Sequence, residues 1–154
     1  MDKNINLKYI LCILNSKLLN FYFKKLYTDN RDTFPLMKSG NIEELPVFRS
    51  EDQDAFSSFA DLMLSKNKEL FEIKTQFIKV LQSKFPDMRI TVKIENWYNL
   101  SFAEFSRELV KQKIKLSLEE QTEWLSHFEK HKDRAEAVKT TIEITDKTID
   151  KMVY

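Results

Sequence analysis

The sequence predicts a mainly α-helical protein, built around a long antiparallel coiled-coil hairpin, with a small mixed α/β remnant at its N-terminus. Three observations favour this fold class. The 154 residues include one glycine and three prolines, whereas tight β-turns and nucleotide-binding βαβ folds draw heavily on glycine. Two stretches repeat apolar residues in alternating steps of three and four, which is the spacing of coiled coils. Serines followed three residues later by Glu or Gln indicate helix starts.

The first predicted helix covers about residues 5–26. Its segment ILNSKLLNFYFKKLY carries apolar residues on more than one face, so we expect folded protein to cover it on more than one side. Cys12 is the only cysteine and lies among apolar neighbours. We interpret it as a buried thiol rather than a nucleophile. One cysteine fits a reducing compartment, and the interrupted apolar run suits neither a signal peptide nor a membrane span. We therefore expect a cytoplasmic protein without membrane contact.

The next segment, TFPLMKSGNIEELPVF, predicts short extended pieces punctuated by Pro35, Gly40 and Pro46. Ser39-Gly40-Asn41 is the best turn candidate in the sequence. With the first helix, this segment makes residues 1–49 the predicted small mixed α/β remnant.

A long helix is predicted over about residues 51–85. The sequence SEDQ suggests a capping box with Ser50 as N-cap and Gln53 at the third helical position, and Pro86 ends the helix. Its seam is interrupted only by Lys66. The other seam positions are Phe56, Phe59, Met63, Leu70, Ile73, Phe77 and Val80. About 35 residues at a rise of 1.5 Å give a rod of roughly 50 Å.

Residues 50–154 are predicted to form a helical hairpin scaffold. The alternation of Ile90, Val92 and Ile94 favours a short extended reversal, and Ser101 with Glu104 starts a short helix over about 101–113. Ser117 with Glu120 starts a last helix over 118–154. Its seam is Trp124, Phe128, His131, Ala135, Val138, Ile142, Thr145, Ile149 and Met152. Residues 54–82 should then pair antiparallel with residues 122–152.

Two sequence patterns resemble metal-binding or catalytic motifs, but we interpret both as ordinary residues of helices. His127 and His131 are four residues apart, but the zincin pattern needs Glu where Phe128 stands, and no third ligand is near. Glu72-Ile73-Lys74 with Asp61 resembles a nuclease motif, but these residues fall on one helix and their carboxylates cannot converge on a metal. The sequence also lacks a glycine-rich cofactor loop and a Gly-x-Ser-x-Gly motif. We therefore expect no catalytic residue, no metal site and no cofactor in this chain.

Charge is unevenly distributed along the chain. The net charge is +1, residues 1–50 carry 8 − 5 = +3, and residues 118–154 carry 6 − 9 = −3. An anionic partner is therefore expected to meet the first third of the chain.

The order of segments resembles a known family. YILCILNSKLLNFYFKKL, then FPLMKSGNIEELPVF, then the capped heptad helix resemble the C-terminal target-recognition region of bacterial restriction–modification proteins. The resemblance is in particular to combined type II restriction enzyme–adenine-specific DNA methyltransferases, and more loosely to specificity subunits. WYNLSFAEFSRELVKQKIKLSLEEQTEW and EITDKTIDKMVY look like the tail of the combined enzymes. The Asn-Pro-Pro-Tyr signature, the cofactor loop and the nuclease are missing, so the chain is expected to be a fragment or a split product.

The resemblance implies a non-catalytic DNA-specificity and spacer segment, in which residues 1–49 are the C-terminal remnant of a target-recognition domain. Its partners would be duplex DNA and the methyltransferase and nuclease part of the parent protein, which is expected to use S-adenosylmethionine and Mg²⁺. The candidates for phosphate contact, which position the duplex rather than read bases, are Lys24, Lys25, Arg31 and Lys38. The alternative is a helical protein–protein interaction module without a DNA role, forming a homodimer through its helical seams; it is favoured by the near-neutral charge and the lack of a recognisable site.

Overall fold

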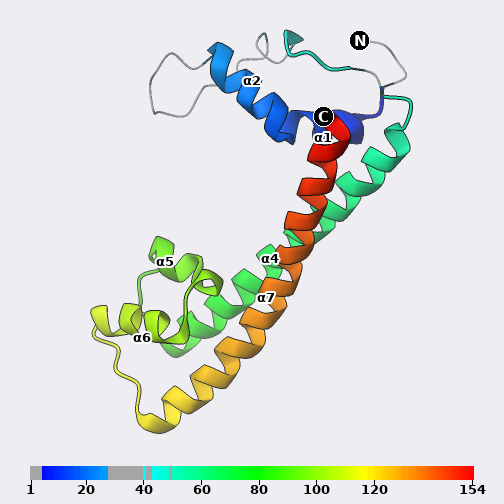
Figure 1. Cartoon of the computed structure of the whole chain (residues 1–154). Helices are drawn as coiled ribbons and strands as arrows, with labels where there is room; N and C mark the ends of the chain where they lie inside the picture. The colour runs from blue at the N-terminus through cyan, green and yellow to red at the C-terminus, as the bar shows by residue number, and fades with distance from the viewer. Residues whose placement is uncertain (1–4, 28–39, 41–42, 49) are drawn as a thin grey trace. The chain divides into compact units, whose positions relative to one another are not determined.

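The computed structural model describes residues 5–27, 40, 43–48 and 50–154. Every regular element within these residues is a helix, and none is a strand. In chain order they are α1 (Leu7–Asn15), α2 (Lys17–Tyr27), α4 (Gln53–Lys84), α5 (Val92–Glu95), the 3₁₀ helix η1 (Trp97–Asn99), α6 (Phe102–Lys111) and α7 (Leu118–Val153), as Figure 1 shows. The prediction of a mainly helical protein is confirmed. None of these helices is long and apolar enough to cross a bilayer.

The predicted α/β remnant is wrong for the residues that the structure describes. Residues 46–48 form no ladder; instead Leu45 is buried among helical side chains and the Phe48 carbonyl accepts a hydrogen bond from the Tyr9 hydroxyl. These extended pieces therefore pack individually on helices, without a strand partner to complete a sheet. Of the predicted turn, Ser39 and Asn41 lie outside the described residues.

The first predicted helix is two helices, because Ser16 interrupts it. Ser16 has extended dihedrals (φ −63°, ψ 150°), its hydroxyl donates to the Ile13 carbonyl at 2.7 Å, and it accepts from the Leu19 N–H at 3.3 Å. Ser16 thus closes α1 and caps α2. This helix start has no capping-box pattern, because the third helical position holds Leu19 instead of Glu or Gln.

The chain divides into two compact units, residues 1–65 with 143–154 (unit 1) and residues 66–142 (unit 2). Helices α4 and α7 contribute residues to both units. In unit 1, side chains of α1 and α2 share a buried cluster with the start of α4 and the end of α7. Its buried members are Tyr9, Cys12, Ile13, Leu19, Phe23, Leu45, Phe56, Ala60, Ile149 and Val153.

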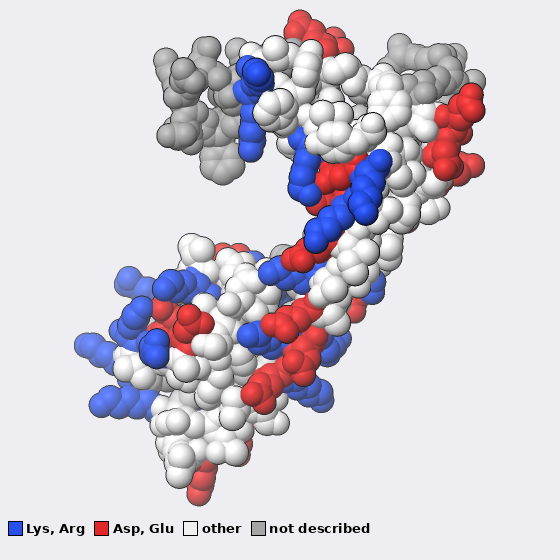
Figure 2. Space-filling view, viewed as in Figure 1, with Lys and Arg blue, Asp and Glu red and all other residues white. Residues whose placement is uncertain are grey.

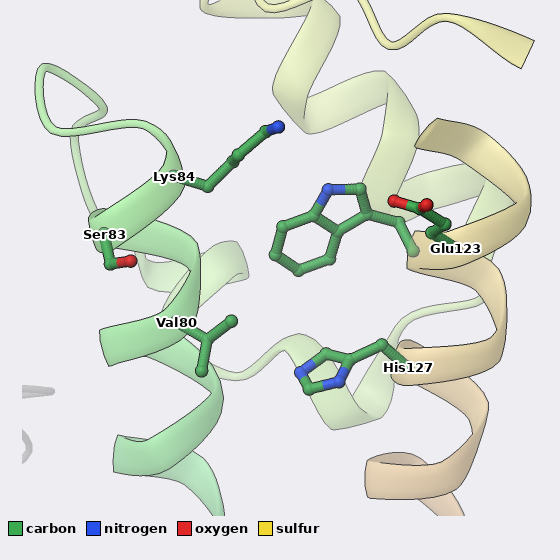
Figure 3. Close-up of a pocket in the computed structure, with 6 residues that line it drawn as sticks. Val80, Ser83, Lys84, Glu123 and His127 are labelled. Atoms are coloured by element: carbon green, nitrogen blue, oxygen red, sulfur yellow. The ribbon is translucent and has the colours of Figure 1, made fainter. Parts of the chain in front are cut away.

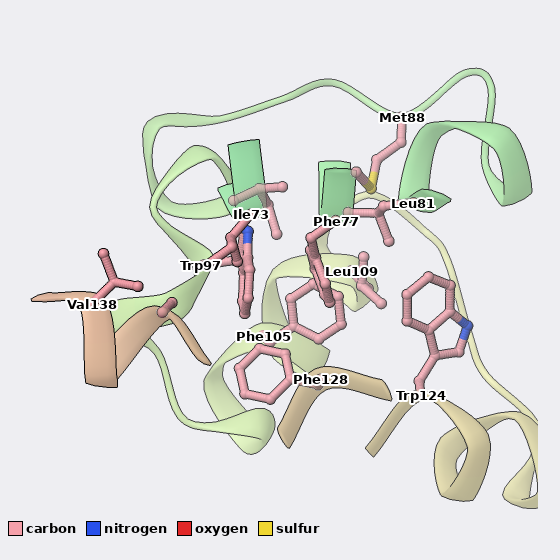
Figure 4. Packing of buried hydrophobic residues seen from close by; sticks show 12 residues of the cluster. Ile73, Phe77, Leu81, Met88, Trp97, Phe105, Leu109, Trp124, Phe128 and Val138 are labelled. Atoms are coloured by element: carbon pink, nitrogen blue, oxygen red, sulfur yellow. The ribbon is translucent and has the colours of Figure 1, made fainter. Parts of the chain in front are cut away.

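Unit 2 has an aromatic core centred on Phe77 of α4, drawn in Figure 4. The Phe77 ring stacks on Trp97 with centroids 3.9 Å apart and meets Phe105 and Phe128 edge-on at 5.6 and 6.0 Å. These rings come from α4, η1, α6 and α7, so the short helices are part of the core. The other buried members are Ile73, Leu81, Met88, Ile94, Leu109, Trp124, Ala135 and Val138.

Of four local predictions along residues 50–154, two are corrected and two are confirmed. Residues 92–95 are helical rather than extended, because Thr91 caps α5 by accepting from the Ile94 N–H. Helix α4 begins at Gln53, so Ser50 is not its N-cap, and the Gln53 side chain accepts from the Asn6 N–H instead. The capping hydrogen bonds predicted at Ser101 and Ser117 are present.

The predicted seams agree with burial over most of α7 and only part of α4. On α7, Trp124, Phe128, Ala135, Val138, Thr145 and Ile149 are all buried. On α4, Val80 is 45% exposed while Leu81 is fully buried. Ile73, Phe77 and Leu81 are spaced by two successive steps of four instead of the alternating four and three of a heptad, so the buried position is Leu81 and not Val80. The coiled-coil pairing itself stays a prediction.

Candidate functional site

Two of the four predicted phosphate-contacting side chains lie on the last turn of α2. Lys24 and Lys25 are both exposed, and the Lys25 Nζ lies 5.8 Å from the centroid of the Phe21 ring, a cation–π distance. Arg31 and Lys38 lie outside the described residues. The structure therefore brings Lys24 and Lys25 together at the helix end, where cations also interact favourably with the helix dipole.

Helices α1 and α2 also expose apolar side chains, which together we call the apolar stripe. Its members on α2 are spaced by three and four residues, so they share one side of the helix. Their exposed fractions are 38% for Leu18, 64% for Phe21, 39% for Tyr22 and 53% for Leu26, and α1 adds Leu7 at 78% and Leu11 at 40%. Exposed aromatics beside lysines can stack on bases, support phosphate contacts or pack on another protein surface.

Asp150 of α7 holds the start of α2 in place. Its carboxylate accepts from the Lys17 backbone N–H at 2.9 Å and from the Lys17 Nζ at 2.7 Å, and its side chain is 10% exposed. Burial by itself would raise the pKa of Asp150, but the hydrogen bonds and charge of Lys17 outweigh burial and lower it. The same carboxylate raises the pKa of Lys17 through a hydrogen bond and its charge, with a smaller contribution from Asp146. The carboxylate also lies at the N-terminus of α2, where the helix dipole favours negative charge.

Sequence reasoning missed this role of Asp150. The residue belongs to the tail segment EITDKTIDKMVY, for which the sequence predicts seam positions and a family resemblance but no role for Asp150. A carboxylate on an apolar helix stripe, between buried Ile149 and Val153, was the signal available, because a buried acid needs a partner.

Contacts of Tyr9 and Cys12 hold α1 against the first turns of α4 within unit 1. The Tyr9 ring meets Phe56 edge-on at 5.1 Å, and the Cys12 thiol donates to the Phe56 carbonyl at 3.3 Å. Burial raises the pKa of both the Tyr9 hydroxyl and the Cys12 thiol. The prediction of a buried Cys12 thiol is confirmed, and the raised pKa keeps it protonated and unreactive at neutral pH.

His127 and His131 lie against the aromatic core of unit 2. Their ring centroids are 4.4 Å apart, and His127 stacks on Phe77 at 5.6 Å. The His127 Nε2 and the His131 Nδ1 are buried without a hydrogen-bond partner. Burial, with smaller effects from neighbouring cations, lowers the pKa of both imidazoles. Within the described residues no group of three or more His, Cys, Asp or Glu side chains could hold a metal ion.

A shallow cavity in unit 2 lies beside His127, between the last turns of α4 and the first turns of α7 (Figure 3). Its lining lysine, Lys84, pairs with Glu120 at 3.2 Å. The other lining residues are Val80, Ser83, Glu123, Trp124 and His127. Ser83 and His127 come from different helices, and no hydrogen bond between them is present to activate the hydroxyl as a nucleophile.

The residues of the apparent nuclease motif lie on one helix, as predicted, and two of them have separate partners. Asp61 pairs with Lys8 at 2.6 Å, and Lys74 pairs with Glu95 at 2.9 Å. Glu72 is exposed on the same helix. The two ion pairs hold Asp61 and Lys74 in place. The carboxylates of Asp61 and Glu72 are therefore not arranged to bind one metal.

Comparison with known proteins places two family models along the chain. Residues 1–47 match a model described as a TaqI-like C-terminal specificity domain. Residues 49–153 match a model described as a domain of unknown function, DUF8810. No curated protein and no solved structure matches the chain. Because the second match spans well over half of the 154 residues, the chain belongs to the DUF8810 family.

Proposed function

We propose that this chain is a DNA target-recognition and spacer segment of a bacterial restriction–modification enzyme and is not catalytic by itself. The observation that carries the proposal is the match of residues 1–47 to a TaqI-like C-terminal specificity domain. In this proposal residues 1–49 belong to the recognition domain and residues 50–154 form the scaffold, with α4 and α7 as an antiparallel helical hairpin.

The proposed contact to DNA is made by the cations near the end of α2. Lys24 and Lys25 are exposed there beside the Phe21 ring, and we assign the same role to Arg31 and Lys38. Lysine and arginine side chains bind phosphate oxygens irrespective of sequence, so these residues would fix the register of the duplex rather than read bases.

The scaffold would determine the direction in which α2 presents these cations. The Lys17–Asp150 contact ties the first turn of α2 to α7. Rigid support of this kind limits the loss of side-chain freedom on binding. Asp150 would thus act as a positioning residue, through α2.

The proposed partner of the chain is the methyltransferase and nuclease part of a cytoplasmic parent enzyme. That part would bind S-adenosylmethionine and Mg²⁺ and carry out the chemistry, while this chain would select where it acts. The resemblance of the segment order supports this assignment.

Neutralising two lysines tests the DNA contact. We expect the double variant K24A/K25A to weaken binding of the full chain to duplex DNA equally for all sequences. The slope of log Kd against log salt should fall by about 2, since each lost phosphate contact removes about 0.9. The matched control is K68A/K79A, which removes two exposed lysines of α4. Equal effects of the two variants in fluorescence anisotropy would contradict the assignment to α2.

A second candidate function, dimerisation without a DNA role, is favoured by the apolar stripe. Most residues of the predicted seams are buried or half-buried within the chain, so the stripe is the better surface for a second copy. In that case F21E/L26E should convert a dimer to a monomer in sedimentation. A wild-type chain that sediments as a monomer at high concentration would exclude this function.

A further inference from the structure

The α5–α6 part of unit 2 has an exposed group of cations, which we call the basic face. Its members are Arg89, Lys93, Arg107, Lys111, Lys113 and Lys115, and all six are exposed. Figure 2 shows Lys and Arg gathered over this part of unit 2. Residues 89–115 carry 6 − 3 = +3, whereas the whole chain carries +1, so the remaining residues sum to 1 − 3 = −2. The segment is therefore more basic than the chain as a whole.

The three acidic residues of this segment are held by other groups. The Glu108 side chain is only 11% exposed and lies 2.7 Å from the Lys111 Nζ and 3.7 Å from the Lys93 Nζ. Glu104 folds back to accept from the Ser101 N–H in the capping box of α6. Glu95 pairs with Lys74 of α4. What this segment presents to solvent is thus mainly its cations.

Contacts within unit 2 bring several of these cations together. Lys93 of α5 and Lys111 of α6 share the Glu108 carboxylate, and both keep about two thirds of their side chains exposed (66% and 65%). Arg107 and Lys93 both act through their charge on Glu104 and lower its pKa, after the larger effect of the Ser101 hydrogen bonds.

The loop before α5 is fixed to the end of α6 as well. The Arg89 N–H donates to the Gln112 side chain at 2.8 Å, and Gln112 donates back to the Arg89 carbonyl at 3.0 Å. Arg89 is therefore held at the end of α6 that carries Lys111 and Lys113.

We propose that the basic face of unit 2 contacts the phosphate backbone of duplex DNA without reading its sequence. The choice of DNA among polyanions rests on the function proposed above. The ten residues of α6 span about 15 Å at 1.5 Å each, and a duplex carries one charge per roughly 1.7 Å. A face of this length can therefore contact several phosphates of a duplex at once, whereas a single small anion would contact only part of the face.

The test replaces three cations of the basic face that form no ion pair with Glu108. We expect R107Q/K113Q/K115Q to bind a 30-base-pair duplex at least about tenfold more weakly at low salt. The slope against log salt should fall by 2 to 3, equally for unrelated sequences. The control K68Q/K79Q/K147Q removes the same charge from exposed lysines elsewhere. Circular dichroism verifies the fold of both variants.

A second variant keeps the proposal testable if the first one unfolds. K93Q/E108Q/K111Q removes two cations together with the carboxylate that they share, so that no buried charge is left unpaired. We expect it to lower the slope by about 2. An unchanged slope in a folded variant, or an equal loss in the control, would overturn the proposal.

Comparison with K24A/K25A separates this inference from the proposed function. If only the α2 variant weakens binding, the inference fails and the proposed function stands; if only the basic-face variants do, the inference stands and the α2 contact fails. No duplex binding by the wild-type chain at low salt would overturn both. Preferential displacement of the duplex by polyglutamate at equal total charge would overturn the inference in favour of an acidic protein partner.

Discussion

At the scale of single residues, buried polar groups decide where this protein is sensitive to change. Asp150 has its partner in Lys17, whereas the Nε2 of His127 and the Nδ1 of His131 are buried without a partner in the described part of the chain. A buried polar group with a partner stabilises the fold modestly, but one without a partner costs about 1–3 kcal/mol. Replacing Asp150 should therefore destabilise the protein, whereas replacing the two histidines should remove a pH-dependent loss of stability.

We expect D150N to lower the free energy of unfolding by about 1–2 kcal/mol, because it leaves the start of α2 without a charged acceptor. The pKa of Asp150 is lowered in the folded state, below its ordinary 3.8. The stabilisation is therefore complete above about pH 4 and disappears as the pH falls through the folded-state pKa. Urea titrations at pH 7 and pH 3 measure both effects. The control D146N should cost less than about 0.5 kcal/mol, because Asp146 lies 3.7 Å from Lys17 and is 42% exposed.

We expect unit 2 to lose stability as the pH falls below about 6.5. Burial lowers the pKa of His127 and His131 in the folded state, so protonation favours the unfolded chain. The neighbouring charges are the cations Lys130 and Arg134 on α7 and, around the cavity, Lys84 and Glu123. The variant H127F/H131L should flatten the change in urea midpoint between pH 7.5 and pH 5.5. A wild-type midpoint that is constant over this range would contradict the expectation.

At the scale of elements, the end of α6 and the two faces of α4 determine how these helices contribute to stability. Helix α6 ends in a Schellman motif, in which the Ile114 N–H donates to the Leu109 carbonyl and the Lys113 N–H donates to the Val110 carbonyl. The residue in the left-handed position is Lys113, with φ 64°, where glycine is usual.

We expect K113G to raise the free energy of unfolding by about 1 kcal/mol, since glycine adopts the left-handed region without the steric cost of a Cβ. The control K113A removes the same charge and keeps the Cβ, so it should be neutral or destabilising. Thermal denaturation followed at 222 nm compares the three proteins. If both variants behave alike, charge rather than backbone conformation is the determinant.

Helix α4 has a buried and an exposed face that carry the same residue type. Phe77 is fully buried and Phe71 is 65% exposed. We expect F77A to cost about 3–5 kcal/mol, because it opens a cavity among the rings of Trp97, Phe105 and Phe128. F71A should cost less than about 0.5 kcal/mol. Equal losses of unfolding free energy for F77A and F71A in urea titrations would contradict the assignment of a buried and an exposed face to α4.

At the scale of the whole molecule, a small net charge conceals two groups of cations on different parts of the chain. One lies at and after the end of α2, and the other is the basic face of unit 2. Because salt screens exposed charges beyond a Debye length of about 10 Å at 0.1 M, a phosphate responds to the charges near it rather than to the sum over the chain. Net charge alone is therefore a poor guide to DNA binding by this protein.

We expect the chain to bind duplex DNA weakly and without sequence preference, with Kd of roughly 10⁻⁴ to 10⁻⁶ M near physiological salt. Contacts from Lys24, Lys25, Arg31 and Lys38 alone would give a salt slope of about −4. Contribution from the basic face would make the slope about −6 or steeper. Anisotropy titrations at several salt concentrations distinguish these cases. Nanomolar, sequence-selective binding at moderate salt would instead show that a base-reading surface is present.

The sequence by itself determined the helical class, the starts of α6 and α7, most of the buried face of α7 and the burial of Cys12. These features depend on local spacing and capping, which act over a few residues and are readable without the fold. Only the tertiary structure decided the break at Ser16, the helical form of residues 92–95, the exposure of Val80 and the partner of Asp150. The start of α2 and the partner of Asp150 depend on the Lys17–Asp150 contact, which joins residues 133 positions apart. In residues 92–95 the local Thr91 cap acts together with the packing of Ile94 into the aromatic core of unit 2, and this packing overrides the alternating pattern. The basic face also depends on tertiary structure, because other groups engage the carboxylates that would neutralise it. Glu104 is held by Ser101, Glu95 by Lys74, and Glu108 by its neighbouring lysines.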